Sequence, residues 1–237
     1  MQFKANLFLT VLAILVLGLL LSLGFWQLDR AQQKQDLLDL QSSRMSLPAV
    51  ELINITVSDN NMRYLPVRVA GELDVAQQIL IDNQVRHGIA GYSVLTPLRI
   101  NSKKAILLNR GWLPLGGDRN VLPDVTVQAS NVQVSGKLDH FPTVGLKLDK
   151  ADELSAGWPA ITQVVDTDKV SKRLGYQVMP YQLLLNADEA EGYNRDWVVM
   201  RMGPEKHHGY AFQWFALATS WVIIYFVLTV KRRCEEE

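Results

Sequence analysis

A stripe of histidine, aromatic and alanine side chains is the strongest chemical feature of this sequence. Five residues at spacings of three and four fall on one side of a helix: His207, Tyr210, Ala211, Trp214 and Ala218. A neutral imidazole is a common axial ligand of haem iron, and aromatic rings beside small alanines can accept a flat macrocycle. The adjacent His208 is an alternative ligand. The competing interpretation is an aromatic belt of Tyr210 and Trp214 at a membrane surface, with both histidines hydrated.

A second candidate site is the segment Asn109-Arg110-Gly111-Trp112, at the end of an apolar run. The guanidinium of Arg110 can bind a carboxylate or a haem propionate through two parallel hydrogen bonds, with Trp112 packed beside it. Equally, Arg110 can hold a structural ion pair while Gly111 forms a bulge or a close backbone approach. The sequence leaves both interpretations open.

Trp26 and Arg30 lie one helical turn apart where the first apolar run ends. They are predicted to anchor this helix at the membrane boundary, with Arg30 facing the region of His207. The alternative is a simple headgroup contact, in which the arginine stem lies along the helix and its charge reaches water.

The remaining residues show no catalytic or metal-binding pattern. His87 and His140 lie in loop-like sequence without metal-ligand spacing, so we expect them to be solvated. The sequence contains no Gly-x-Ser-x-Gly, no His-Glu-x-x-His and no glycine-rich phosphate loop. We therefore expect no catalytic residue and no metal site, and a tethered hydrolase is the least favoured function.

Two apolar runs lie near the ends of the 237-residue chain and predict membrane helices. Residues 5–28 and 209–230 carry no charged side chain, and each run can cross a hydrocarbon core, which takes roughly 20 apolar residues. We place the transmembrane helices at residues 7–24 and 210–230. The formal net charge of zero shows no basic footprint, so no nucleic-acid partner is expected.

Basic residues predict the orientation of these helices. Lys231, Arg232 and Arg233 follow the second run directly, and Lys4 precedes the first. Because basic flanks stay in the cytoplasm, we expect both termini and the tail at 231–237 to be cytoplasmic, with the central domain outside. The single cysteine, Cys234, then lies inside the cell, so the outer domain has no disulfide and no cysteine metal site.

The central segment, residues 25–206, is predicted to fold in water as an α+β domain with a mainly antiparallel sheet or barrel. Its start, near 25–43, lacks glycine and proline, so the first helix should continue out of the membrane until Pro48. Alternation from Val67 predicts a strand there. Further strands are predicted at 78–82, 91–99, 105–112, 132–138, 160–165, 181–186 and 197–202. A short helix at 168–174 is expected to start at Asp166 or Thr167 and to stop at Gly175.

Four stretches together resemble the surfeit locus protein one family, and the resemblance runs in order along the whole chain. They are Gly24-Phe25-Trp26-Gln27-Leu28-Asp29-Arg30 with Lys34, residues 91–98 (GYSVLTPL), residues 108–114 (LNRGWLP) and residues 207–218 (HHGYAFQWFALA). The third and fourth are the most specific. The family pattern Asn-His-x-x-Tyr-Ala-x-x-Trp places its histidine on His207, although Lys206 stands here in place of the asparagine.

The resemblance implies a non-enzymatic assembly factor for a haem-copper terminal oxidase such as cytochrome c oxidase. It implies help with the insertion of haem a into subunit I, and contact with subunit I, haem a synthesis or other oxidase assembly factors, and membrane lipid. The implied location is the bacterial inner membrane. The alternative is a structural scaffold that docks on subunit I without touching haem.

The first apolar run also resembles a signal peptide, because Ser22-Leu23-Gly24 has a small-x-small pattern. Its length exceeds the usual apolar region of about 7–15 residues, so we expect it to be retained. N-terminal sequencing of the protein extracted from membranes should therefore find the uncleaved start. A mature chain beginning at Phe25 would rule out the two-helix arrangement.

Overall fold

The computed structural model describes residues 7–55, 62–119, 121–145, 149–197 and 202–231. The chain divides into two compact units. A helical unit combines Met1–Leu40 with Val198–Glu237, and a β-rich unit comprises Gln41–Trp197.

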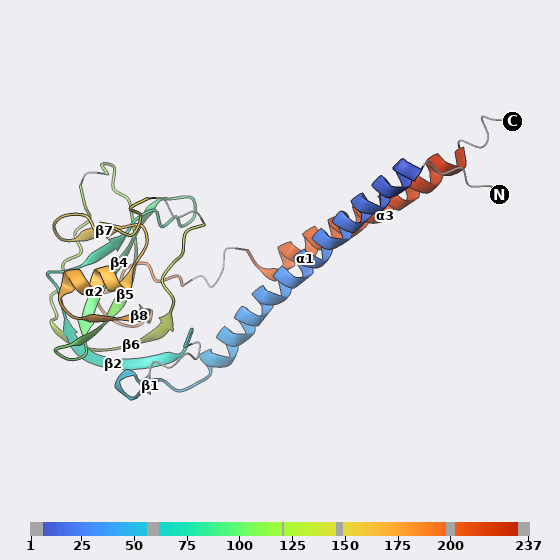
Figure 1. Ribbon diagram of the computed structural model, residues 1–237. Coiled ribbons are helices and arrows are strands. Elements are labelled where there is room, and N and C mark those ends of the chain that lie inside the picture. The colour runs from blue at the N-terminus through green and yellow to red at the C-terminus, as the bar shows by residue number, and fades with distance from the viewer. Residues whose placement is uncertain (1–6, 56–61, 120, 146–148, 198–201, 232–237) are drawn as a thin grey trace. The chain divides into compact units, whose positions relative to one another are not determined.

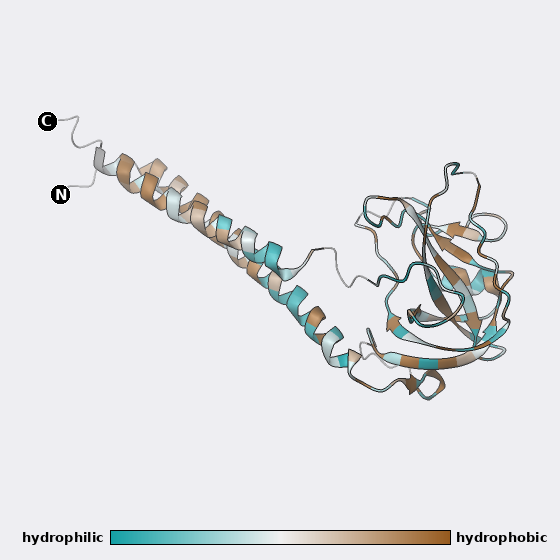
Figure 2. Ribbon diagram, turned by 180° about the vertical axis from the view of Figure 1, so that it is seen from behind, coloured by the Kyte–Doolittle hydropathy of each residue, from teal (hydrophilic) through white to brown (hydrophobic). Residues whose placement is uncertain are grey.

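Two long helices form the helical unit: α1 (Leu7–Met45) and α3 (Pro204–Lys231). Both are long and apolar enough to cross a membrane. Figure 2 shows their hydrophobic colouring and the change to hydrophilic residues in the later part of α1. The prediction that the first helix extends beyond its apolar run is confirmed, and it ends at Met45, before Pro48. The second helix begins six residues earlier than the predicted span, so His207 is inside it.

Contacts along their length show that α1 and α3 run antiparallel. Near one end, the hydroxyls of Thr10 and Tyr225 lie 2.9 Å apart. The indole Nε1 of Trp221 donates to the carbonyl of Ala13 at 3.1 Å. Small buried residues also line the two helices: Gly24, Ala31, Ala211 and Ala218. Small side chains let helices approach closely where apolar burial gives no preference over lipid.

Gly24 illustrates this close approach. A Cβ atom at this position would lie 2.6 Å from Cε1 of Phe215, a separation that real Cβ atoms do not show. The ring of Phe215 also packs edge-on against Phe25, with centroids 5.4 Å apart. Gly24, the small residue in the pattern that resembles a cleavage site, therefore has a packing role against α3.

The β-rich unit contains one sheet in the order β1-β2-β6-β8-β5-β4-β3-β7 (Figure 1). Its strands are β1 (Val50–Glu51), β2 (Pro66–Leu73), β3 (Ile79–Ile81), β4 (Gly91–Arg99), β5 (Lys104–Pro114), β6 (Asn131–Asp139), β7 (Ala160–Thr162) and β8 (Gln177–Leu185). A short 3₁₀ helix spans Leu52–Asn54. The end of β2 also pairs with β4, so β2, β6, β8, β5 and β4 close into a ring. The predicted barrel-like domain between two helices is confirmed.

The sheet is mixed, which refines the expected mainly antiparallel arrangement. Three neighbouring pairs are parallel: β1 with β2, β3 with β7, and β5 with β8. Strand β8 begins at Gln177, four residues before the predicted start, because Pro180 interrupts the strand pattern. The pairing of β8 with β5 shifts register at this point. In the strand predicted at 197–202, Trp197 is not part of a strand, and residues 198–201 lie outside the described residues.

Apolar side chains cover both surfaces of the central strands. One cluster includes Val67 and Val69 of β2, Ile106 of β5 and Leu183 of β8. The helix α2 (Thr167–Leu174) covers the other surface, where its Val170 packs with Leu95 and Leu107. Packing on both sides leaves β4 buried from Gly91 to Leu98, including the polar Ser93 and Thr96, whereas β2 alternates between buried and more exposed residues.

The ends of α2 match the sequence prediction. Oδ1 of Asp166 accepts hydrogen bonds from the backbone N–H groups of Asp168 at 3.0 Å and Lys169 at 3.1 Å. This satisfies two donors that the first helical turn leaves unpaired. Gly175 ends the helix in the left-handed conformation, with a φ of 81°.

Replacing this N-cap should loosen α2 measurably. We expect Asp166→Ala to lower the free energy of unfolding by about 1 kcal/mol, whereas Asp166→Asn retains an acceptor and costs less. Tryptophan fluorescence during denaturant unfolding of the full-length protein can report the change, because Arg173 of α2 lies 4.8 Å from the ring centroid of Trp158. Equal stability of the alanine variant and the parent would contradict the prediction.

Candidate functional site

Asn109, Arg110 and Gly111 form a bulge in β5. Opposite them on β4, Val94 pairs with Gly111 and the next residue, Leu95, pairs with Asn109, so Arg110 is the extra residue. The side chain of Asn109 spans the bulge, since its Oδ1 accepts from the N–H of Gly111 at 3.1 Å. Its Nδ2 donates to Oε1 of Gln182 at 2.8 Å. The buried amide of Asn109 thus fixes the local backbone.

Gly111 has a φ of 122°, a conformation that residues with a Cβ rarely adopt. A Cβ atom here would also lie 2.7 Å from the carbonyl oxygen of Asn194. Two constraints therefore require glycine at this position: the backbone conformation and the close approach of Asn194. The expected bulge or close approach at this position is present.

The side chain of Arg110 is 2% exposed and lies in a cage of mostly uncharged acceptors. Its Nη1 donates to the carbonyl of Val125 at 2.9 Å and to Oε1 of Gln78 at 3.0 Å. Its Nε donates to the carbonyl of Glu191 at 2.7 Å. The ring of Tyr193 stacks with the guanidinium, whose central carbon is 4.9 Å from the ring centroid.

The charge of Arg110 has one weak ionic partner among the described residues. A carboxylate oxygen of Glu191 is 3.8 Å from Nη2, and the Glu191 side chain is itself partly exposed. Burial lowers the pKa of Arg110, while Tyr193 and Glu191 oppose the shift. An arginine remains charged under these conditions. Its donors point into the domain, which favours the structural interpretation over propionate binding.

Trp112 also bonds the segment 191–194, which contacts Arg110. Its backbone N–H donates to the carbonyl of Asn194 at 2.8 Å, and its indole Nε1 donates to the carbonyl of Gln84 at 2.7 Å. The N–H of Tyr193 donates to the carbonyl of Arg110 at 2.7 Å. The motif at 109–112 therefore pins residues 191–194, which precede α3 in the chain.

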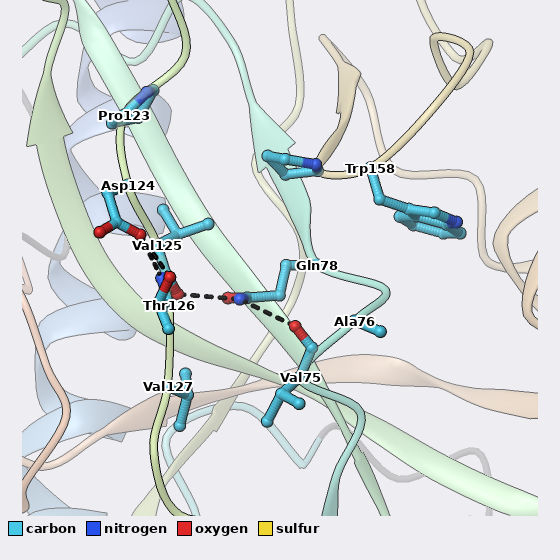
Figure 3. Close-up of a pocket in the computed structure, with 10 residues that line it drawn as sticks. Val75, Ala76, Gln78, Pro123, Asp124, Val125, Thr126, Val127 and Trp158 are labelled. Atoms are coloured by element: carbon cyan, nitrogen blue, oxygen red, sulfur yellow. Dashed lines mark hydrogen bonds between the residues drawn. The ribbon is translucent and has the colours of Figure 1, made fainter.

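A pocket of about 290 Å³ opens beside Gln78 (Figure 3). Trp158 and Pro159 line it together with residues 75–76 and 123–127. The amide of Gln78 donates to the carbonyls of Val75 at 3.2 Å and Val125 at 2.8 Å. Its oxygen accepts from Thr96 and Arg110. These internal bonds engage both ends of the Gln78 amide, and we assign the pocket no ligand.

In the helical unit, His207 is half-buried between the two helices. Its Nδ1 is 2.8 Å from Oε1 of Gln27 on α1. With Oε1 of the Gln27 amide as the acceptor, Nδ1 of His207 carries the proton. In the neutral imidazole the second ring nitrogen, Nε2, then has the lone pair that a metal ion or a haem iron binds.

The other members of the predicted stripe are divided between covered and open positions. Ala211 and Ala218 are buried, and Trp214 is half-buried. Tyr210 is 45% exposed, and His208 is exposed as well. The structure thus distinguishes the two histidines, because His207 is the one fixed against α1. Haem binding by either of them stays a prediction.

Trp26 and Arg30 interact with each other on α1. The guanidinium carbon of Arg30 is 5.7 Å from the ring centroid of Trp26, and its Nη1 donates to Oε1 of Gln33 at 2.9 Å. Both residues are exposed, as an anchor at a membrane surface requires. Gln27, which the sequence analysis did not single out, makes the contact with His207 that had been expected near Arg30.

Among the described residues, no group of three or more histidine, cysteine, aspartate or glutamate side chains can hold a metal ion. His87 and His140 are both exposed. The ring of His140 packs against Tyr181, with centroids 5.0 Å apart.

Together these features define a class of protein: a closed β domain carried between two helices that are able to cross a membrane. The sequence profile of the SURF1 family matches residues 14–219, so this chain belongs to the SURF1 family. Members of this family are known generally as cytochrome oxidase assembly factors. The family therefore points to an assembly factor rather than an enzyme.

Individual relatives agree with this assignment. A SURF1-like protein of Rickettsia bellii is 26% identical over 232 residues, covering 92% of this chain and 88% of the relative. One from Rickettsia felis is 24% identical, covering 94% of this chain and 96% of the relative. A SURF1-like protein of Caenorhabditis briggsae is 34% identical over 127 residues, covering 43% of this chain and 40% of the relative.

The strained bulge gives a direct test of the motif at 109–112. We expect Gly111→Ala to lower the free energy of unfolding by about 2–4 kcal/mol, because it combines backbone strain with a clash against Asn194. Gly116→Ala is the matched control, since a Cβ there meets nothing within 4 Å. Denaturant unfolding of the full-length variants provides the measurement. Similar losses in the two variants would contradict the proposed role of Gly111.

Proposed function

We propose that this protein is an assembly factor for a haem-copper terminal oxidase such as cytochrome c oxidase, and that it assists the insertion of haem a into subunit I. Membership of the SURF1 family supports the first part. The observation that carries the second part is the hydrogen bond of His207 with Gln27, because it leaves Nε2 of the imidazole for iron.

The residues around His207 fit a haem group. Bound haem a would supply an iron centre and a flat, largely apolar macrocycle. His207 would hold the iron through Nε2. Trp214 and the exposed ring of Tyr210 offer aromatic surface on the same side of α3, whereas Ala211 between them is buried. His208 remains the alternative ligand, whereas the buried donors of Arg110 serve the β-rich unit.

The proposed setting is the bacterial inner membrane, with α1 and α3 as membrane helices. Their basic flanks, Lys4 and residues 231–233, favour cytoplasmic termini and an extracytoplasmic β-rich unit. The proposed partners are subunit I of the oxidase, haem a synthesis or other assembly factors, and membrane lipid.

A second candidate is a scaffold that docks on subunit I without binding haem. Large apolar side chains on α3 that the rest of the protein leaves uncovered favour it, among them Phe212, which is 74% exposed. Such a surface can contact lipid or another membrane helix equally well. The scaffold needs neither histidine, which separates it from the preferred function.

The test compares the parent, His207→Ala and His208→Ala, each purified as the full chain from cells that make haem a. We expect stoichiometric haem in the visible spectrum of the parent and of His208→Ala, and loss of that haem in His207→Ala. In cells that lack the protein, haem a in the assembled oxidase should fall while subunit I is still made.

Two outcomes would overturn the haem-binding part. One is a parent protein without stoichiometric haem. The other is a His207→Ala variant whose haem content and spectrum match the parent. If both histidine variants also co-purify with subunit I as the parent does, the scaffold function replaces it.

A further inference from the structure

Gln27 is an amide near the end of an otherwise apolar stretch of α1, and it faces α3. Its side chain is half-buried, and its Oε1 lies 2.8 Å from Nδ1 of His207. Apolar packing does not explain an amide at this position.

The hydrogen bond sets which ring nitrogen of His207 carries the proton. Because Oε1 of Gln27 can only accept, it selects the tautomer with hydrogen on Nδ1 and the lone pair on Nε2. An acceptor bonded to the far nitrogen of a metal-binding imidazole also fixes the ring orientation and raises its basicity. In a site shielded from water, such a bond is stronger than at an exposed surface.

We infer that Gln27 is a positioning residue, which holds the imidazole of His207 in the tautomer and orientation needed to bind haem iron through Nε2. The inference rests on the proposed haem ligation by His207. It extends the site from the stripe on α3 to a residue of α1.

Other hydrogen bonds between the two helices provide controls that distinguish the positioning of His207 from helix association. Thr10 bonds Tyr225, and Trp221 bonds the carbonyl of Ala13, yet none of these four residues belongs to the predicted haem stripe. If Gln27 only joined the helices, losing it would resemble losing the bond of Thr10. Thr10→Val is therefore the matched control for helix association.

The experiment uses full-length Gln27→Leu, Gln27→Glu and Thr10→Val proteins beside the parent and His207→Ala. Each is titrated with haem a, and the reduction potential of the bound haem is measured. We expect Gln27→Leu to weaken haem binding by about 10–100-fold and to raise the potential, because the imidazole becomes a poorer donor to ferric iron. Gln27→Glu keeps a strong acceptor, so it should retain binding and lower the potential. Thr10→Val should match the parent.

A readout without haem completes the test. Ring-nitrogen NMR of isotope-labelled histidine should show the proton of His207 on Nδ1 in the parent and a mixture of tautomers in Gln27→Leu. If Gln27→Leu keeps the affinity, potential and tautomer of the parent, or if Gln27→Glu behaves as Gln27→Leu does, the positioning role is wrong.

Failure of the inference can be told apart from failure of the proposed function. A parent that binds haem through His207 while Gln27→Leu is unchanged refutes the role of Gln27 alone. A parent that takes up no haem, or a His207→Ala protein that binds normally, refutes the haem function and the inference with it.

Discussion

The arrangement of loops in the β-rich unit depends on the cost of burying one positive charge. Arg110 is almost fully covered, so each guanidinium donor that lost water needs an acceptor from the protein. The acceptors come from separate segments: Gln78 directly before β3, the carbonyl of Val125 after β5, and Glu191 beyond β8. The bulge that turns Arg110 inward therefore ties together loops that share no strand pairing, and the left-handed Gly111 is the backbone condition for that bulge.

The helical unit obeys a different constraint, because apolar burial cannot by itself hold two helices together in lipid. Close packing at Gly24 and polar bonds at several levels supply the attraction instead. In this setting a polar group can join the helices and also prepare a ligand. The pair of Gln27 and His207 meets the first need by its hydrogen bond, and the same bond decides which nitrogen of the imidazole is left to react.

Sequence patterns predicted most elements, since both helix spans, the cap at Asp166 and most strands follow from local chemistry. The parallel pairing of β5 with β8 and the pairing of β2 with β4 that closes the ring were not predictable, because they join residues far apart in the chain. The helical placement of the candidate residues was predicted, and their role stays a prediction. The stripe that contains His207 follows from helical spacing. Its partner Gln27 depends on how α1 and α3, which are far apart in the chain, pack against each other. A clue was nonetheless present in Gln27, a polar residue in an apolar run.

The motifs around Arg110 and His207 differ in whether their polar atoms are still available to a ligand. Around Arg110 the donors meet carbonyls, an amide and an aromatic ring of the same domain, so the motif is explained by the stability it provides. At His207 one nitrogen is engaged by Gln27, which leaves the other nitrogen to bind a ligand. A side chain whose hydrogen bonds are completed within the fold serves the fold. A side chain that is held by one internal hydrogen bond and keeps a second polar atom for other partners is suited to bind a ligand. For this reason the haem proposal rests on His207 and not on Arg110.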